Sequence, residues 1–237
     1  MISQSRMAIM GEMIGMIAHQ WRQPITVIGM ITNNMILDLH LESFEGKRAI
    51  KELETVDKQV HYLSRTIDDF RNFFKPNRLA QYVSFSQIRD ELILILGKSF
   101  ESYNIHLSFE GAMDVKIKTF KNELLQVFLN ILANAKDAFS GKNIQGAHVR
   151  VKMEAFDQNL KFFIEDNAGG IETTIINKIF EPYFSTKDEK NGTGLGLYMS
   201  AMIVEKHLGG NIMVCPKDDG TLFQITIKSV EEQNDVY

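Results

Sequence analysis

Residues 122–139, NELLQVFLNILANAKDAF, carry the pattern that decides the fold of the larger part of this chain. Apolar residues recur every three or four positions, which predicts an amphipathic helix over 121–139. Asn130 and Asn134 are four residues apart, so they share one face of that helix. Because amides at the edge of an apolar face need polar partners, a hydrated metal or a phosphate would suit these two side chains.

Three further short motifs follow this helix in order. The stretch IEDNAGGI, 164–171, runs from a hydrophobic strand into Asp166 and then into two glycines that allow a tight turn. A carboxylate at a strand end can accept the amino group of adenine, although an ordinary acidic turn has the same pattern. The aromatic stretch KIFEPYFSTK, 178–187, comes next. Finally GTGLGL, 192–197, opens a helix, and the backbone N–H groups of such glycine-rich helix starts bind phosphates readily.

In order, spacing and identity, these four motifs resemble the N, G1, F and G2 boxes of the histidine-kinase ATP-binding domain. That domain belongs to a superfamily shared with DNA gyrase and the large heat-shock ATPase chaperones. The likeness extends over about 82–228, because GGNIMV and DDGTLFQITI resemble the closing strands of that fold. It implies an α/β sandwich in which helices cover one face of a mixed sheet. At its start, YVSF indicates a short strand, and Ser86 is the candidate cap of the helix that follows.

The resemblance implies that the domain binds ATP and Mg²⁺. Asn134 is the implied magnesium ligand, with Asn130 beside it. Asp166 is the implied partner of adenine, and Gly170 is expected to lie against the base.

The lid and the phosphate-binding turn are implied in the same way. Residues 184–193 are expected to form a mobile lid, in which Lys187 is a candidate phosphate contact. Two positions depart from the family pattern: Ala168 stands where the first G1 glycine is usual, and Asp137 where many relatives have a basic residue. The triphosphate is expected to follow the backbone of Gly192, Thr193, Gly194, Leu195 and Gly196.

The first 76 residues have a different pattern, a three–four alternation of apolar residues in two series separated by LESFEGK, 41–47. This predicts two helices joined by a turn. Because one hairpin has too little apolar surface to enclose a core, we expect a homodimer with a four-helix bundle. The alternative is a long monomeric hairpin packed on the rest of the chain. The two series are Met7, Met10, Ile14, Ile17, Trp21, Pro24, Ile28, Ile31 and Met35, and Leu53, Val56, Val60, Leu63, Ile67, Phe70 and Phe74.

His19 falls at the most exposed heptad position of the first helix, and Gln23 follows one turn later on the same face. Pro24 removes a backbone hydrogen bond, which predicts a bend one turn after the histidine. The stretch AHQWRQPI, 18–25, resembles the H-box of sensor histidine kinases, which implies that His19 accepts a phosphoryl group. Gln20 stands where most relatives have a carboxylate. Gln23 stands where related kinases place a residue that orients water to dephosphorylate the partner.

The combined resemblance implies an ATP-dependent protein-histidine kinase that phosphorylates itself on His19. The phosphoryl group would then pass to an aspartate on a response-regulator receiver domain. Two alternatives stay open: a dimeric scaffold that binds ATP without kinase activity, and an ATPase that lacks a protein acceptor. Gln20 and Ala168 favour the scaffold, because both depart from the family pattern.

Composition sets the outer limits. A net charge of −4 argues against nucleic acid as the main partner, and the one cysteine, Cys215, favours a reducing cytoplasm. No stretch approaches the roughly 20 apolar residues of a membrane span, so we expect a cytoplasmic protein or the cytoplasmic part of a longer one. The predicted organisation is a helical hairpin at 1–76, a linker at 77–81, an ATP-binding domain at 82–230 and a polar tail at 231–237.

Overall fold

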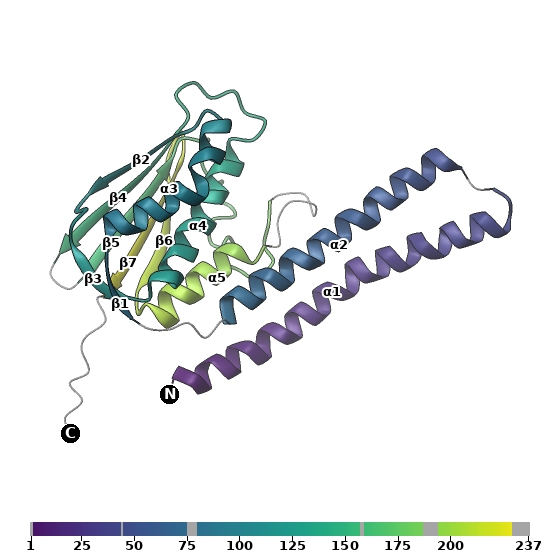
Figure 1. Cartoon of the computed structure of the whole chain (residues 1–237), viewed down its shortest axis with the longest axis horizontal. Coiled ribbons are helices and arrows are strands. Elements are labelled where there is room, and N and C mark those ends of the chain that lie inside the picture. The colour runs from purple at the N-terminus through teal and green to yellow at the C-terminus, as the bar shows by residue number, and fades with distance from the viewer. Residues whose placement is uncertain (1, 44, 75–79, 157–158, 187–193, 229–237) are drawn as a thin grey trace. The chain divides into compact units, whose positions relative to one another are not determined.

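Figure 1 shows the computed structural model of the chain, which describes residues 2–43, 45–74, 80–156, 159–186 and 194–228. The side chains of 2–20, 65 and 68–74 are outside this description. The chain forms two compact units, a helical hairpin that ends at Phe74 and an α/β unit that follows it. This confirms the predicted fold class. The predicted polar tail and most of the predicted linker lie outside the described residues.

The hairpin consists of α1 (Ile2–His40) and α2 (Gly46–Phe74), which lie side by side. The turn between them lies where the sequence predicts it, and Glu42 there has a left-handed φ of 54°. Arg48 at the start of α2 forms ion pairs with Asp38 of α1 at 3.5 Å and with Glu52 at 3.0 Å. The pair with Asp38 joins the two helices next to the turn, whereas the pair with Glu52 lies within α2.

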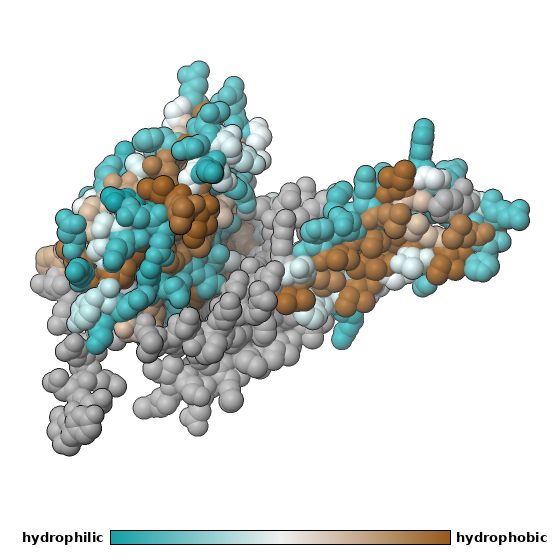
Figure 2. Space-filling view, in the orientation of Figure 1, coloured by the Kyte–Doolittle hydropathy of each residue, from teal (hydrophilic) through white to brown (hydrophobic). Residues whose placement is uncertain are grey.

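The predicted apolar positions of the hairpin differ in burial between α1 and α2. On α1, Pro24 is buried within the continuous helix, so the proline does not end it; the bend at this residue stays a prediction. On α2, three apolar side chains seven residues apart remain open to solvent: Leu53, Val60 and Ile67 are 54%, 50% and 45% exposed. Figure 2 shows apolar side chains at the surface of the hairpin. Among the described residues, none of the helices is both apolar and long enough to cross a membrane.

The α/β unit is built on a mixed five-stranded sheet in the order β2–β4–β5–β7–β6. β2 pairs in parallel with β4, and the other neighbours are antiparallel. Helices α3 (Phe85–Ser102), α4 (Lys121–Ala138) and α5 (Gly196–Met202) lie over one face, as predicted (Figure 1). The strands are β2 (His106–Gly111), β4 (His148–Phe156), β5 (Asn159–Asp166), β6 (Asn211–Pro216) and β7 (Thr221–Lys228).

The core lies between that face of the sheet and the helices. Strands β4, β5 and β7 alternate between buried and more exposed residues, as a sheet covered on one face requires. Phe162 at the centre of β5 meets Phe128 of α4 edge-on at 5.1 Å between ring centroids, and Phe85 of α3 at 5.8 Å. Each such ring contributes about 1.5–3 kcal/mol by leaving water. The core therefore fixes α4 over the strand that ends at Asp166.

A small second sheet was not predicted. β1 (Gln81–Ser84) pairs antiparallel with β3 (Lys116–Thr119), and the sequence analysis missed β3. The predicted cap was also wrong. Ser84, not Ser86, caps α3: its hydroxyl accepts the N–H of Gln87 at 3.3 Å, and the Gln87 side chain accepts the N–H of Ser84 at 3.0 Å. This reciprocal pair is a capping box, so the helix begins two residues earlier than predicted.

Candidate functional site

Asn130 joins two motifs that are 66 residues apart in the sequence. Its Nδ2 on α4 donates to the carbonyl of Gly196 at 3.2 Å and to Oγ of Ser200 at 3.3 Å, both on α5. The Ser200 hydroxyl also donates to Gly196, at 2.9 Å. The start of α5 is therefore held against α4. Because the amide nitrogen of Asn130 serves these contacts, its carbonyl oxygen is the atom suited to a cation.

Asn134 lies one turn further along α4 and is half-buried. Its amide oxygen is a hard donor of the kind that Mg²⁺ accepts. Mg²⁺ also keeps several waters and binds substrate phosphates, so a partly open position suits it better than a closed cage. The residues at this end of α4 thus fit the implied magnesium ion.

Asp166 is the last residue of β5 and only 7% exposed. Its Oδ1 accepts the N–H of Ala168 at 2.9 Å, and the carboxyl also accepts the N–H of Thr221 on the neighbouring strand β7. Burial raises the pKa of Asp166 above its ordinary value of 3.8, while the two backbone N–H groups and the charge of Lys142 oppose that rise. A buried carboxyl with so few partners is typical of a binding position.

The turn after Asp166 does not need a glycine at position 168, where Ala168 departs from the family pattern. Positive φ values occur at Gly169 and Gly170, 95° and 73°, and not at Ala168. The alanine therefore keeps an ordinary backbone conformation. Its side chain is buried, and its N–H is the group that holds Asp166.

The facing turn between β6 and β7 supplies a residue that the sequence analysis missed. The N–H of Gly169 donates to the carbonyl of Asp219 at 2.9 Å. A Cβ on Gly220 would lie 1.8 Å from the carbonyl oxygen of Asp166, so only glycine fits there. The DDGTLF motif that contains it was assigned to a closing strand. Only the contact between the two turns, which lie about 50 residues apart in the sequence, reveals its role.

Tyr183 and Gly194 close the ends of the predicted lid. Tyr183 has a left-handed φ of 65°, and its N–H donates to the carbonyl of Gly194 at 3.0 Å. A Cβ on Gly194 would lie 2.4 Å from the carbonyl carbon of Tyr183. Leu195 is fully buried. Lys187, Gly192 and Thr193 lie outside the described residues.

A second contact holds the far end of the helix that starts at Gly196. The helix predicted to open at GTGLGL is observed as α5 followed by a short π-helix, η1 (Ile203–His207). Nδ1 of His207 lies 3.2 Å from Oε2 of Glu123 at the start of α4, and both side chains are shielded from solvent. Together with Asn130, this pair fixes the helix against α4 at both ends.

The hairpin carries the other predicted motif. His19 and Gln20 lie within α1, and their side chains are outside the described ones. Gln23 is exposed on the same helix, and Trp21 is half-buried.

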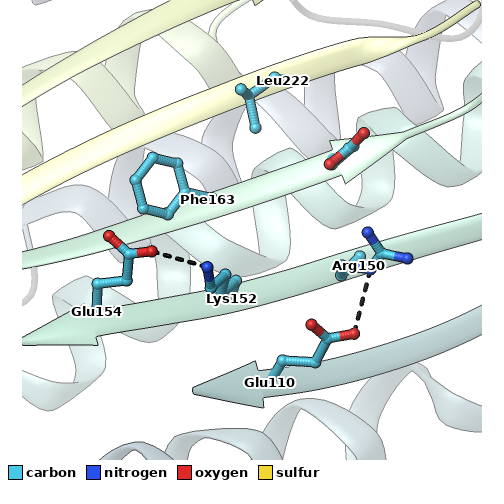
Figure 3. A pocket seen from close by; sticks show the side chains of 7 residues that line it. Glu110, Arg150, Lys152, Glu154, Phe163 and Leu222 are labelled. Carbon is cyan, nitrogen blue, oxygen red and sulfur yellow. Dashed lines mark ion pairs between the residues drawn. The ribbon is translucent and has the colours of Figure 1, made fainter. Parts of the chain in front are cut away.

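A pocket on the opposite face of the sheet is a different feature. It is a hollow of about 290 Å³, lined by Phe163 and charged residues of β2, β4 and β5 (Figure 3). Its charges are already paired: Arg150 with Glu110 at 3.2 Å, and Lys152 with Glu154 at 2.8 Å. Of the described residues of the four motifs, only Glu165 lines it, so we do not assign the nucleotide to it.

Comparison with known proteins supports the motif assignment. The family described as histidine kinase-, DNA gyrase B- and HSP90-like ATPase matches residues 120–231. Two-component sensor PprA of Pseudomonas aeruginosa is 29% identical over 232 residues, which cover 94% of this chain and 25% of PprA. Signal transduction histidine-protein kinase AtoS of Escherichia coli is 30% identical over 218 residues, covering 88% of this chain and 33% of AtoS. The chain belongs to the histidine kinase family.

This histidine-kinase chain spans a quarter to a third of the length of these curated relatives. Solved structures share its fold. Histidine kinase ThkA in complex with response regulator protein TrrA matches with a TM-score of 0.69 and 21% identity, over 98% of this chain and 65% of that one. The catalytic domain of ThkA matches with a TM-score of 0.58 and 23% identity, over 64% and 97%.

The burial of Asp166 gives a prediction about stability. A carboxyl whose pKa is raised by folding destabilises the folded chain at pH values above the raised pKa, and this cost shrinks as the pH falls from there to 3.8. Asp166→Asn resembles the protonated form. We therefore expect the nucleotide-free variant to unfold at a higher temperature than the unsubstituted chain at neutral pH, with the difference vanishing in acid. Asp218→Asn, at an exposed position, is the control; a lower midpoint for Asp166→Asn at neutral pH contradicts the prediction.

Proposed function

We propose that this chain is a protein-histidine kinase that uses ATP to phosphorylate His19. It then passes the phosphoryl group to an aspartate of a response-regulator receiver domain. The observation that carries the proposal is the buried carboxyl of Asp166, presented by a glycine turn next to a helix pair that joins Asn130 to the start of α5. The H-box resemblance of AHQWRQPI supplies the acceptor on the same chain.

Adenine recognition follows from the chemistry of Asp166. An ionised carboxylate only accepts hydrogen bonds, so it pairs with the exocyclic amino group of adenine. Gly170 lets the backbone approach the base, because its positive φ and missing Cβ keep the turn tight. The triphosphate would then run toward Gly194 and Gly196 at the start of α5. Lys187, Gly192 and Thr193 complete the proposed phosphate contacts.

The amide oxygen of Asn134 would hold Mg²⁺, with Asn130 beside it. Bound there, the ion would neutralise charge on the phosphates during transfer.

The acceptor step is an in-line displacement. At pH ~7 an imidazole with an ordinary pKa of about 6.5 is mostly neutral, so a ring nitrogen of His19 has a lone pair. That nitrogen forms a bond to the γ-phosphorus as the bond to the bridging oxygen breaks, and ADP leaves with the electron pair. The other ring nitrogen becomes more acidic, and the amide oxygen of Gln20 can accept its N–H. An amide cannot take the proton, so we propose a slow or partner-dependent reaction.

The exposed stripe on the hairpin supports a homodimer. Leu53, Val60 and Ile67 repeat every seven residues on α2, and Met30 and Leu37 do so on α1, all about half exposed in one chain. A second hairpin would cover them in a four-helix bundle. ThkA, a relative in fold, is known in complex with a response regulator, which is consistent with the proposed partner. Gln23, exposed one turn after His19, is the candidate to orient water in dephosphorylation of that regulator.

Incubation of the full chain with Mg²⁺ and ATP labelled on the γ-phosphate tests this function. We expect label that is stable to base and lost in acid, as for a phosphoramidate, and no label on His19→Ala. His40→Ala, which removes an exposed histidine of the same helix, is the control and should label normally.

The two alternatives predict different outcomes. An unlabelled chain that still binds ATP contradicts the kinase and supports the scaffold. ATP turnover that survives His19→Ala supports an ATPase without a protein acceptor.

Gln20→Glu tests the role of the residue after the histidine. A carboxylate there can accept the proton from the imidazole, and such assistance is typically worth about 10²–10⁴-fold. We expect the initial rate of autophosphorylation to rise by at least about tenfold, toward that range. Asn33→Asp, which adds a carboxylate at an exposed position of the same helix, should leave the rate unchanged. An unchanged or slower rate for Gln20→Glu contradicts the assigned role.

A further inference from the structure

Lys142 connects the end of α4 to the turn after Asp166. It follows the helix in the stretch SGKN, and its backbone N–H donates to the carbonyl of Phe139 at 3.0 Å, which fixes its position. Its Nζ donates to the carbonyl of Ala168 at 2.5 Å. The two residues are 26 positions apart, so this contact is a tertiary one and was not predicted from any motif.

The Ala168 residue is therefore held from both sides. Its N–H donates to Oδ1 of Asp166, and its carbonyl accepts from Lys142. The ammonium also lies along the next residue, since a Cβ on Gly169 would be 3.4 Å from Nζ. An unbroken series of contacts thus runs from Lys142 through Ala168 to the carboxyl.

We propose that Lys142 is a positioning residue for adenine recognition: by holding the Ala168 carbonyl, it keeps the turn in the form that presents the Asp166 carboxylate to the base. The inference rests on the proposed function, because it assumes that Asp166 binds adenine. The lysine does not itself have to touch the nucleotide.

The charges around Asp166 give Lys142 a second effect. Of the charges that act on this carboxyl, Lys142 lowers its pKa, whereas the neighbouring Glu165 raises it; Glu165 is itself paired with Lys217. Burial is the largest influence and raises the pKa. Loss of the lysine charge would therefore let the carboxyl take up a proton at higher pH. On β4 the titratable residue next to Val149, the pairing partner of Asp166, is His148; those of the facing turn are Lys217, Asp218 and Asp219.

Calorimetric titration of the full chain with ADP, repeated from neutral to acid pH, tests the inference. For Lys142→Met we expect about two- to tenfold weaker binding at neutral pH, the range for one lost hydrogen bond. We also expect binding to fail at a higher pH than in the unsubstituted chain, because only the ionised carboxylate accepts the adenine amino group. Lys142→Arg keeps the charge and a donor and should restore both properties.

Two controls separate the possible failures. Lys161→Met removes an exposed lysine elsewhere on β5 and should bind ADP normally at every pH. Asp166→Asn should lose binding. If Asp166→Asn binds ADP as the unsubstituted chain does, the proposed adenine site is wrong. If Asp166→Asn loses binding while Lys142→Met matches the unsubstituted chain at all pH values, the role of Lys142 is overturned. Weaker binding by an equal factor at every pH also overturns it, because a purely structural change would not move the acid limit.

Discussion

The α/β unit depends on one constraint: a carboxyl group is buried at the end of β5 with backbone N–H groups as partners. Asp166 is almost fully shielded, and the N–H groups of Ala168 and Thr221 hold it. Burying a charge is unfavourable unless the charge is paired. A buried carboxyl with few partners is therefore more typical of a ligand-binding position than of a structural one. The surrounding turns are shaped to match. Position 220 must be glycine because the carbonyl oxygen of Asp166 occupies the space that a Cβ would need.

Helix α4 organises the rest of the site around this carboxyl. Its middle packs on β5 through Phe128, which fixes its height over the strand. On one flank, Asn130 and Glu123 hold the helix that begins at the glycine-rich turn. Beyond its end, Lys142 reaches the turn after Asp166. One helix thus positions the proposed magnesium ligand, the proposed phosphate-binding turn and the proposed adenine-binding turn.

Elements with a local residue pattern were predicted from the sequence. Elements that depend on contacts between residues far apart in the sequence were not. Periodicity predicted α4 and the hairpin, because burial on one face imposes a period on the residues. The motifs and the resemblance indicated β5, β6 and β7. β3 has only four residues and forms beside β1, so no local pattern marks it. The stretch YVSF was assigned to a strand and Ser86 to the cap, yet the capping box begins at Ser84. Lys142 and Gly220 act across the fold, and no spacing within one motif indicates them.

The most direct test is a carbon-13 NMR titration of the Asp166 side-chain carboxyl in the full chain, with and without ADP. Without nucleotide, the account predicts a pKa above the ordinary 3.8, because burial outweighs the two backbone N–H groups and Lys142. With ADP bound, it predicts a fall in that pKa, since the adenine amino group hydrogen-bonds to the ionised form. A pKa at or below 3.8 in the free chain, or no change on adding ADP, would contradict the claim that this carboxyl is kept buried to bind adenine.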